Sequence, residues 1–267
     1  GSRRLVIRVV TDSAAGLPAG IVEELGISVV DLHVMENHGK DGAETSTSGL
    51  TALELAALYG REMERSGDDG VLAIHLSKEL SSTWSAAVTA SGVFPDTVRV
   101  IDSGTAGMAM GAAAMTAAKL AQEGASLKEC YDGAIDTLER SHTWVYLNST
   151  EDLRRSGRMS AATAMLSTAL LATKPIMAVQ AGKLEMVGKT RTQTKAFTKL
   201  VDLVASRAEG KPAFVAVQYN EDEAAARRLE DLLRMALPES SFMRVALTDV
   251  LSVHVGPGAI GVSVVFS

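Results

Sequence analysis

Short β-branched runs alternate with amphipathic segments through the first half of the chain. Strands are predicted at residues 5–10, 27–32 and 97–101, and another buried strand begins at Val71. Helices are predicted between them, from Pro18 to Gly26, at 51–65, after residue 83, at 107–123 and at 126–140. Strands that alternate with helices usually pair in parallel, so this half is expected to be a parallel sheet covered by helices.

The order of elements changes near residue 140. Gln180-Ala181-Gly182 separates the apolar runs 175–179 and 183–187, a pattern typical of a β-hairpin. Further strands are predicted at 143–147, 213–218, 242–248 and 262–266, and helices at 150–153, 160–171, 192–207 and 220–236. The polar segment 36–48 has no period and is predicted to be a loop. We therefore predict two α/β domains, at residues 3–140 and 141–267.

Composition narrows the class of protein. Hydrophobic residues make up 46% and charged residues 22% of the chain, as in ordinary globular proteins, whereas aromatic residues make up 4%. The net charge of -6 and the scarcity of aromatic rings argue against a nucleic-acid-binding protein. A single cysteine, Cys130, is expected in the core and suits a reducing compartment. The given sequence shows neither a signal-peptide pattern nor an apolar run long enough to span a membrane, so we expect a cytoplasmic protein.

Polar side chains follow three of the predicted strands, at Thr11-Asp12-Ser13, at Ser77 and at Asp102-Ser103, and Ser81-Ser82-Thr83 precedes a helix. Ligands of open α/β sheets bind beyond the carboxyl ends of the strands, next to helix N-termini that attract anions. The sequence therefore predicts a site for a small acidic head group. The two aspartates could be catalytic or bind a metal, but we favour the interpretation that they accept hydrogen bonds from backbone N–H groups.

The sequence motifs that would indicate an enzyme are incomplete. The glycine-rich segments 104–111 and 256–261 do not fit a dinucleotide-binding pattern, and the five histidines lack metal-ligand spacing. Ser81 as nucleophile and His254 as base would make a hydrolase, but the Gly-x-Ser-x-Gly turn is missing. We predict no catalytic residue, no metal and no cofactor. A basic cluster consists of Arg154, Arg155 and Arg158. It is either a solvent-exposed surface or a contact with an anion.

A series of short segments, in a fixed order, matches one family pattern. They are Val9-Val10-Thr11-Asp12-Ser13, Thr45-Ser46 (start of Thr-Ser-x-Pro-Ser), Leu80-Ser81-Ser82-Thr83-Trp84 (Leu-Ser-Gly-Thr-Tyr), Val100-Ile101-Asp102-Ser103, Leu153 to Ser160 (Leu-x-Gly-Gly-Arg-Ile), Arg191 with Lys195, and His254 to Gly261. Over nearly its whole length the chain thus resembles the DegV family of bacterial fatty-acid-binding proteins.

The resemblance implies a two-domain α/β fold, with a parallel-sheet N-terminal domain and a smaller mixed C-terminal domain. One long-chain fatty acid would lie in a buried tunnel between the domains. The apolar helices predicted at 107–123 and 160–171 are candidates for the walls of this tunnel, and the alternative is that both belong to the ordinary core. The residues implied to hold its carboxylate are Thr45, Ser46, Ser81, Ser82 and His254. Such proteins are carriers and not enzymes, because a separate ATP-dependent kinase subunit phosphorylates the bound carboxylate for phospholipid metabolism.

The family pattern links Arg158, Arg191 and His254 to that transfer or to partner contact. We expect a monomer that touches membranes only transiently, to exchange lipid. The alternatives are a stand-alone serine esterase and a kinase-like enzyme related by fold to dihydroxyacetone kinases. The chain also departs from the pattern: Ser82 replaces a glycine, Ser48-Gly49 replaces Pro-Ser, and segment 33–44 is shorter, which we expect to alter the head-group geometry or the acyl chain that fits.

Overall fold

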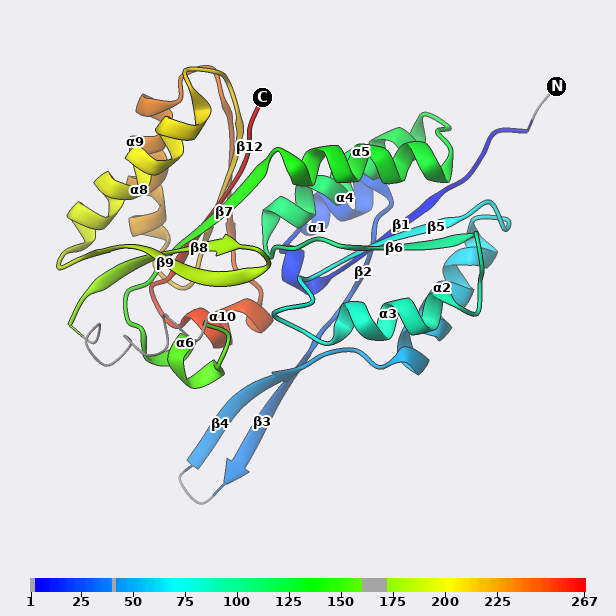
Figure 1. Ribbon diagram of the computed structural model, residues 1–267, viewed down its shortest axis with the longest axis horizontal. Helices are drawn as coiled ribbons and strands as arrows, with labels where there is room; N and C mark the ends of the chain where they lie inside the picture. The colour runs from blue at the N-terminus through cyan, green and yellow to red at the C-terminus, as the bar shows by residue number, and fades with distance from the viewer. Residues whose placement is uncertain (1–2, 40–41, 160–171) are drawn as a thin grey trace.

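A four-stranded parallel sheet forms the N-terminal half of the computed structural model, which describes residues 3–39, 42–159 and 172–267 (Figure 1). The sheet has the strand order β2-β1-β5-β6 and consists of β1 (Arg8–Asp12), β2 (Ser28–Val30), β5 (Val71–His75) and β6 (Val98–Asp102). All of its pairings are parallel. Every residue of β5 is buried, as expected for a strand covered on both faces. The predicted parallel sheet is confirmed.

Helices cover both faces of this sheet. α2 (Ala52–Arg65) and α3 (Thr83–Ser91) lie on one face, and α1 (Ala19–Leu25), α4 (Met108–Gln122) and α5 (Leu127–Glu139) lie on the other (Figure 1). Capping boxes that begin at Thr51 and Ser126 start α2 and α5. A short 3-10 turn, η1 (Ser13–Ala15), follows β1.

A six-stranded mixed sheet forms the C-terminal half, in the order β11-β10-β12-β7-β8-β9. Its strands are β7 (Ser141–Tyr146), β8 (Lys174–Gln180), β9 (Lys183–Thr190), β10 (Phe214–Tyr219), β11 (Ser241–Ala246) and β12 (Ile260–Val265). β10 and β11 are parallel and the other pairings are antiparallel. The predicted hairpin around residues 180–182 is confirmed, because it joins β8 to β9.

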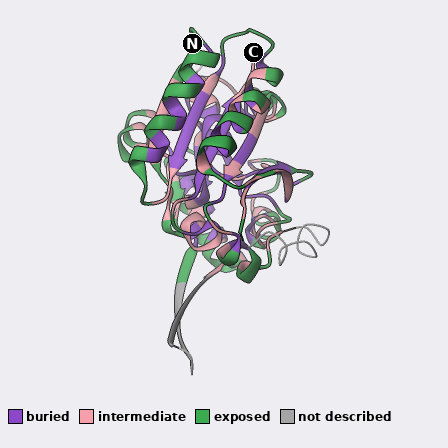
Figure 2. Ribbon diagram, turned by 90° about the vertical axis from the view of Figure 1, so that its left-hand side faces the viewer, coloured by how far each residue is buried: buried purple, intermediate pink, exposed green. Residues whose placement is uncertain are grey.

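Two pairs of helices flank the second sheet. α8 (Gln193–Ala208) and α9 (Glu223–Ala236) cover its outer face, and the short helices α6 (Glu151–Ser156) and α10 (Asp249–Val255) pack against each other near the N-terminal half (Figure 1). Both sheets are buried between helices whose outer faces are exposed (Figure 2). The molecule is therefore a two-domain α/β protein with one parallel and one mixed sheet.

The prediction of a loop at 36–48 is wrong. β3 (His33–Gly39) and β4 (Gly42–Ser48) pair in an antiparallel hairpin that projects from the body of the molecule (Figures 1 and 2). The segment has no apolar alternation to reveal a strand, because a projecting ribbon has no core to face. Helix α10 also has no counterpart among the predicted elements, and the predicted helix at 160–171 lies outside the described residues.

Hydrogen bonds tie the two halves together. The Gln218 Oε1 atom accepts from the Met108 backbone N at 2.9 Å, and the Ser77 hydroxyl donates to the Gly182 carbonyl at 2.8 Å. Cys130 is buried in the N-terminal core, as predicted. No helix in the described part of the chain is both long and apolar enough to cross a membrane.

Candidate ligand-binding cavity

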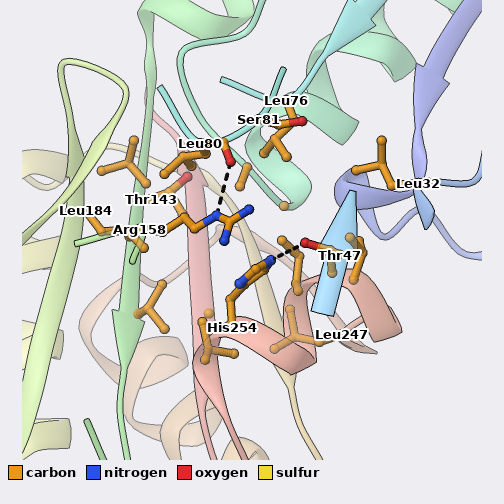
Figure 3. A pocket seen from close by; sticks show the side chains of 18 of the residues that line it. Leu32, Thr47, Leu76, Leu80, Ser81, Thr143, Arg158, Leu184, Leu247 and His254 are labelled. Atoms are coloured by element: carbon orange, nitrogen blue, oxygen red, sulfur yellow. Dashed lines mark hydrogen bonds between the residues drawn. The ribbon is translucent and has the colours of Figure 1, made fainter. Parts of the chain in front are cut away.

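A cavity of about 610 Å³ lies where the carboxyl ends of the parallel strands face the C-terminal sheet. Both halves of the chain contribute to its wall. The wall is largely aliphatic and includes Leu32, Leu76, Leu80, Val145, Val179, Leu184, Leu247, Val250, Leu251 and Val255 (Figure 3). A cavity of this size and lining suits an organic ligand with a substantial apolar part.

Ser81 lies on the turn between β5 and α3 and lines this cavity (Figure 3). Its backbone N donates to the Ser77 carbonyl at 3.1 Å, and its Oγ accepts from the Thr83 backbone N at 3.1 Å. The same Oγ is 2.9 Å from the Thr83 hydroxyl. The turn thus holds a half-buried hydroxyl at the end of a strand, where the sequence predicts the head-group site.

Thr47 and Ser48 line the cavity from the end of β4. Thr45 and Ser46, the residues predicted from the family pattern, lie on the same strand, and their side chains are outside the described part of the structure. Residues 45–48 repeat the dipeptide Thr-Ser, so the Thr-Ser motif of the family can be placed in two registers, one that begins at Thr45 and one that begins at Thr47. The prediction uses the first register. The second register supplies the hydroxyls seen in the cavity.

Arg158 and His254 lie beside these hydroxyls (Figure 3). The Arg158 guanidinium donates to the Ser156 carbonyl at 2.6 Å and to the Leu80 carbonyl at 3.5 Å. The His254 Nε2 atom is 2.7 Å from the Thr47 hydroxyl, while its buried Nδ1 has no hydrogen-bond partner among the described residues. Burial, together with the positive charge of Arg158, lowers the pKa of His254 to about 4, so its imidazole is neutral at pH 7.

Ser82 and Gly49 share one space at the cavity wall. A Cβ atom on Gly49 would lie 2.5 Å from the Ser82 Oγ and 3.2 Å from the Thr83 backbone N. A contact of 2.5 Å is too close for a real side chain, so the absence of one at position 49 leaves room for the Ser82 hydroxyl. Ser82 and, in the first register of the motif, the Ser48-Gly49 departure are therefore neighbours in space.

Ser81 and His254 do not form a nucleophile–base pair. Among the described residues, the Ser81 side chain is hydrogen-bonded to Thr83 and the His254 side chain is hydrogen-bonded to Thr47. Arg191 is exposed between β9 and α8 and is not among the described residues that line the cavity. In the described part of the chain, no group of three or more His, Cys, Asp or Glu side chains is placed to hold a metal ion.

The two strand-end aspartates accept backbone hydrogen bonds, which confirms the favoured interpretation. Asp12 accepts from the backbone N atoms of Ala14 and Leu76, each at 3.0 Å. Asp102 accepts from the backbone N atoms of Gly104 at 3.0 Å and Lys78 at 3.1 Å. Each aspartate thus fixes the turns that carry the cavity wall.

The fold and the cavity together define a two-domain α/β protein built around a largely aliphatic cavity with hydroxyl, guanidinium and imidazole groups in its wall. The chain belongs to the DegV family, since the model of this family, described as an uncharacterised protein family, matches residues 33–267. A DegV domain-containing protein of Corynebacterium glutamicum is 59% identical and covers 98% of this chain and 94% of its own length.

Solved structures of relatives have the same fold. The crystal structure of a DegV family protein from Corynebacterium glutamicum, 59% identical, has a TM-score of 0.94 and covers 98% of each chain. A structure described as fatty acid binding of a DegV family protein from Thermus thermophilus is 28% identical, with a TM-score of 0.90 over 99% of this chain and 100% of that one. DegV from Bacillus subtilis, described as a fatty acid binding protein, is 29% identical, with a TM-score of 0.85 over 98% and 100%.

Proposed function

We propose that this protein binds one long-chain fatty acid in the cavity, with the acyl chain against the aliphatic wall and the carboxylate beside Thr47, Ser81, Arg158 and His254. One observation carries the proposal: hydroxyls and a guanidinium meet in the wall of an otherwise aliphatic cavity. The relatives from Thermus thermophilus and Bacillus subtilis, described as fatty acid binding, support it. Thr45, Ser46 and Ser82 remain predicted head-group contacts.

The acyl chain and the carboxylate of the ligand contribute differently to binding. Burying about fourteen methylenes at roughly 0.8 kcal/mol each offers on the order of 11 kcal/mol before the costs of association. The carboxylate gains less, because it exchanges hydrogen bonds with water for hydrogen bonds with the protein. The chain therefore supplies most of the affinity, and the polar groups fix where the carboxylate lies.

Removing a head-group hydroxyl tests this arrangement. We expect Thr47→Val and Ser81→Ala each to weaken palmitate binding about fivefold to thirtyfold, because each loses a hydrogen bond to a charged group worth about 1–2 kcal/mol. Titration of lipid-free protein with palmitate measures the change. Ser85→Ala, at an exposed position on α3, is the matched control. Unchanged affinity in both cavity variants would place the carboxylate elsewhere.

The proposal includes a partner, which rests on the family resemblance: a separate kinase subunit that phosphorylates the bound carboxylate with ATP. The chain itself would be a carrier and not an enzyme, monomeric, cytoplasmic and in transient contact with membranes. Arg158 lies in the cavity wall and Arg191 is exposed, so the two arginines suit different roles, the first toward the carboxylate and the second toward the partner.

The role of Arg191 toward the partner can be tested by measuring fatty acid binding and acyl-phosphate formation separately. Arg191→Ala is expected to bind palmitate like the unchanged protein and to reduce acyl-phosphate formation in the presence of the kinase and ATP, because an exposed guanidinium outside the cavity contributes to partner contact only. Arg207→Ala, at an exposed arginine of α8, is the control. Equal losses of binding and transfer in Arg191→Ala would assign Arg191 to the ligand or the fold.

A further inference from the structure

We infer that Ser82 makes the cavity prefer an ionised carboxylate to an uncharged head group, and that it can do so only because residue 49 is a glycine. The inference rests on the proposed fatty acid binding and adds a specificity-determining residue to it. Ser82 and Gly49 both line the cavity. Ser82 directly precedes α3 and Gly49 directly follows β4, so two segments that are distant in the sequence meet at this point of the wall.

Ser82 occupies the N-cap position of α3 without capping the helix. A serine at this position usually accepts a hydrogen bond from a backbone N–H of the first turn. The Ser82 backbone has helical angles, with φ of -80° and ψ of -3°, and its side chain makes no capping hydrogen bond. The Thr83 backbone N donates to the Ser81 Oγ instead, at 3.1 Å. The Ser82 side chain is therefore not used by the helix.

The hydroxyl of Ser82 is free, whereas those of its two neighbours are engaged. The Ser81 Oγ is 2.9 Å from the Thr83 Oγ1, which also accepts from the Leu50 backbone N at 3.3 Å. Within the described ranges no hydrogen bond uses the Ser82 hydroxyl, and the residue is exposed. Its proton is thus available to a ligand. An ionised carboxylate is a suitable partner, because it only accepts hydrogen bonds.

Gly49 is required by the space around it and not by its backbone conformation. Its φ is not positive, so the left-handed region that favours glycine does not explain the residue. A Cβ atom at this position would lie 2.5 Å from the Ser82 Oγ, 3.1 Å from the Thr83 Oγ1 and 3.2 Å from the Thr83 backbone N. The first distance is too short for a real Cβ atom. A side chain at position 49 and the present position of the Ser82 hydroxyl therefore exclude each other.

The residues on either side of this contact belong to the proposed head-group site. Ser81 comes just before Ser82, Thr47 and Ser48 come just before Gly49, and all of them line the same cavity. A hydrogen bond to an ionised group is about twice as strong as one between neutral groups. The Ser82 hydroxyl therefore stabilises a bound carboxylate more than it stabilises an uncharged head group such as an alcohol.

Two ligands with the same chain and different head groups test the specificity. Lipid-free protein is titrated with palmitate and with hexadecanol. Ser82→Ala removes the hydroxyl and keeps the Cβ atom, and we expect it to weaken palmitate binding about fivefold and hexadecanol binding by less than about twofold. Ser85→Ala, at an exposed position on α3, is the matched control and is expected to change neither affinity.

A double-mutant cycle tests the dependence on Gly49. Gly49→Ala places a methyl group against the Ser82 Oγ and is expected to displace this hydroxyl, with the same loss of about fivefold in palmitate affinity. In Gly49→Ala/Ser82→Ala no hydroxyl is left to displace, so we expect the loss seen in Ser82→Ala alone. Gly20→Ala is the control, because a Cβ atom there would meet no heavy atom within 4 Å. Thermal melts of the lipid-free variants separate a loss of binding from a loss of folding.

The outcomes separate this inference from the proposed function. Equal losses for palmitate and hexadecanol in Ser82→Ala, or no loss for either ligand, would overturn the specificity role of Ser82 and leave fatty acid binding intact. Losses that multiply in the double variant would overturn the dependence of Ser82 on Gly49. Failure of the unchanged protein to bind palmitate would overturn the proposed function itself.

Discussion

The Gly261→Leu variant is expected to lose fatty acid affinity by about a hundredfold while the free protein stays folded. Gly261 lies on β12 in the cavity wall, and the nearest heavy atoms to a Cβ atom there are at 3.9 Å. A leucine side chain would enter the cavity and displace about four methylenes of the ligand, worth roughly 3 kcal/mol at about 0.8 kcal/mol each. The free protein is expected to stay folded, because a Cβ atom at this position would make only ordinary van der Waals contacts and the position lines the cavity.

Titration with stearate and a thermal melt of the lipid-free protein measure the two effects of Gly261→Leu separately. Gly20→Leu is the matched control, because Gly20 is exposed on α1 and a Cβ atom there would meet no heavy atom within 4 Å. Unchanged stearate binding by a folded Gly261→Leu protein would mean that the acyl chain does not lie over the C-terminal sheet.

The Asp12→Ala substitution is expected to lower the free energy of unfolding by about 3–5 kcal/mol, because it leaves several buried hydrogen-bond donors without an acceptor. Asp12 is fully buried and accepts from two backbone N–H groups. It is also 3.0 Å from the Nδ1 of buried His75, whose Nε2 is 2.7 Å from the Tyr59 hydroxyl. For a protein of this size the loss corresponds to a fall of the melting temperature by roughly 10 °C.

Asp102→Ala is the control for Asp12→Ala. Asp102 also ends a strand and accepts from two backbone N–H groups, but it is only partly buried and water replaces its bonds. Its melting temperature is expected to fall by less than half as much. Equal falls for the two variants would show that the His75–Tyr59 contacts add nothing to the stability that Asp12 provides.

The first sheet could be predicted from sequence because its signals are local. Each parallel strand is a short apolar run followed by polar residues, and α2 and α5 begin at capping boxes that are visible in the sequence. The β3–β4 hairpin could not be found in this way, because its residues are polar and its base is held by α10 across a long sequence separation. The Thr47–His254 hydrogen bond spans 207 positions.

The cavity was predictable only in part. Short motifs single out Ser81, Arg158 and His254, and the structure brings all three into one wall. Thr47 and Ser48 were missed because the repeated Thr-Ser dipeptide permits two registers.

The mass of the intact protein under native conditions tests the proposed fatty acid site most directly. We predict that the purified chain carries one fatty acid per molecule, that organic extraction removes it, and that added stearate restores one equivalent. Gly261→Leu should carry less, because its affinity is expected to be about a hundredfold lower. A lipid-free, folded protein that takes up no stearate at any concentration would contradict the proposal that this cavity binds a fatty acid.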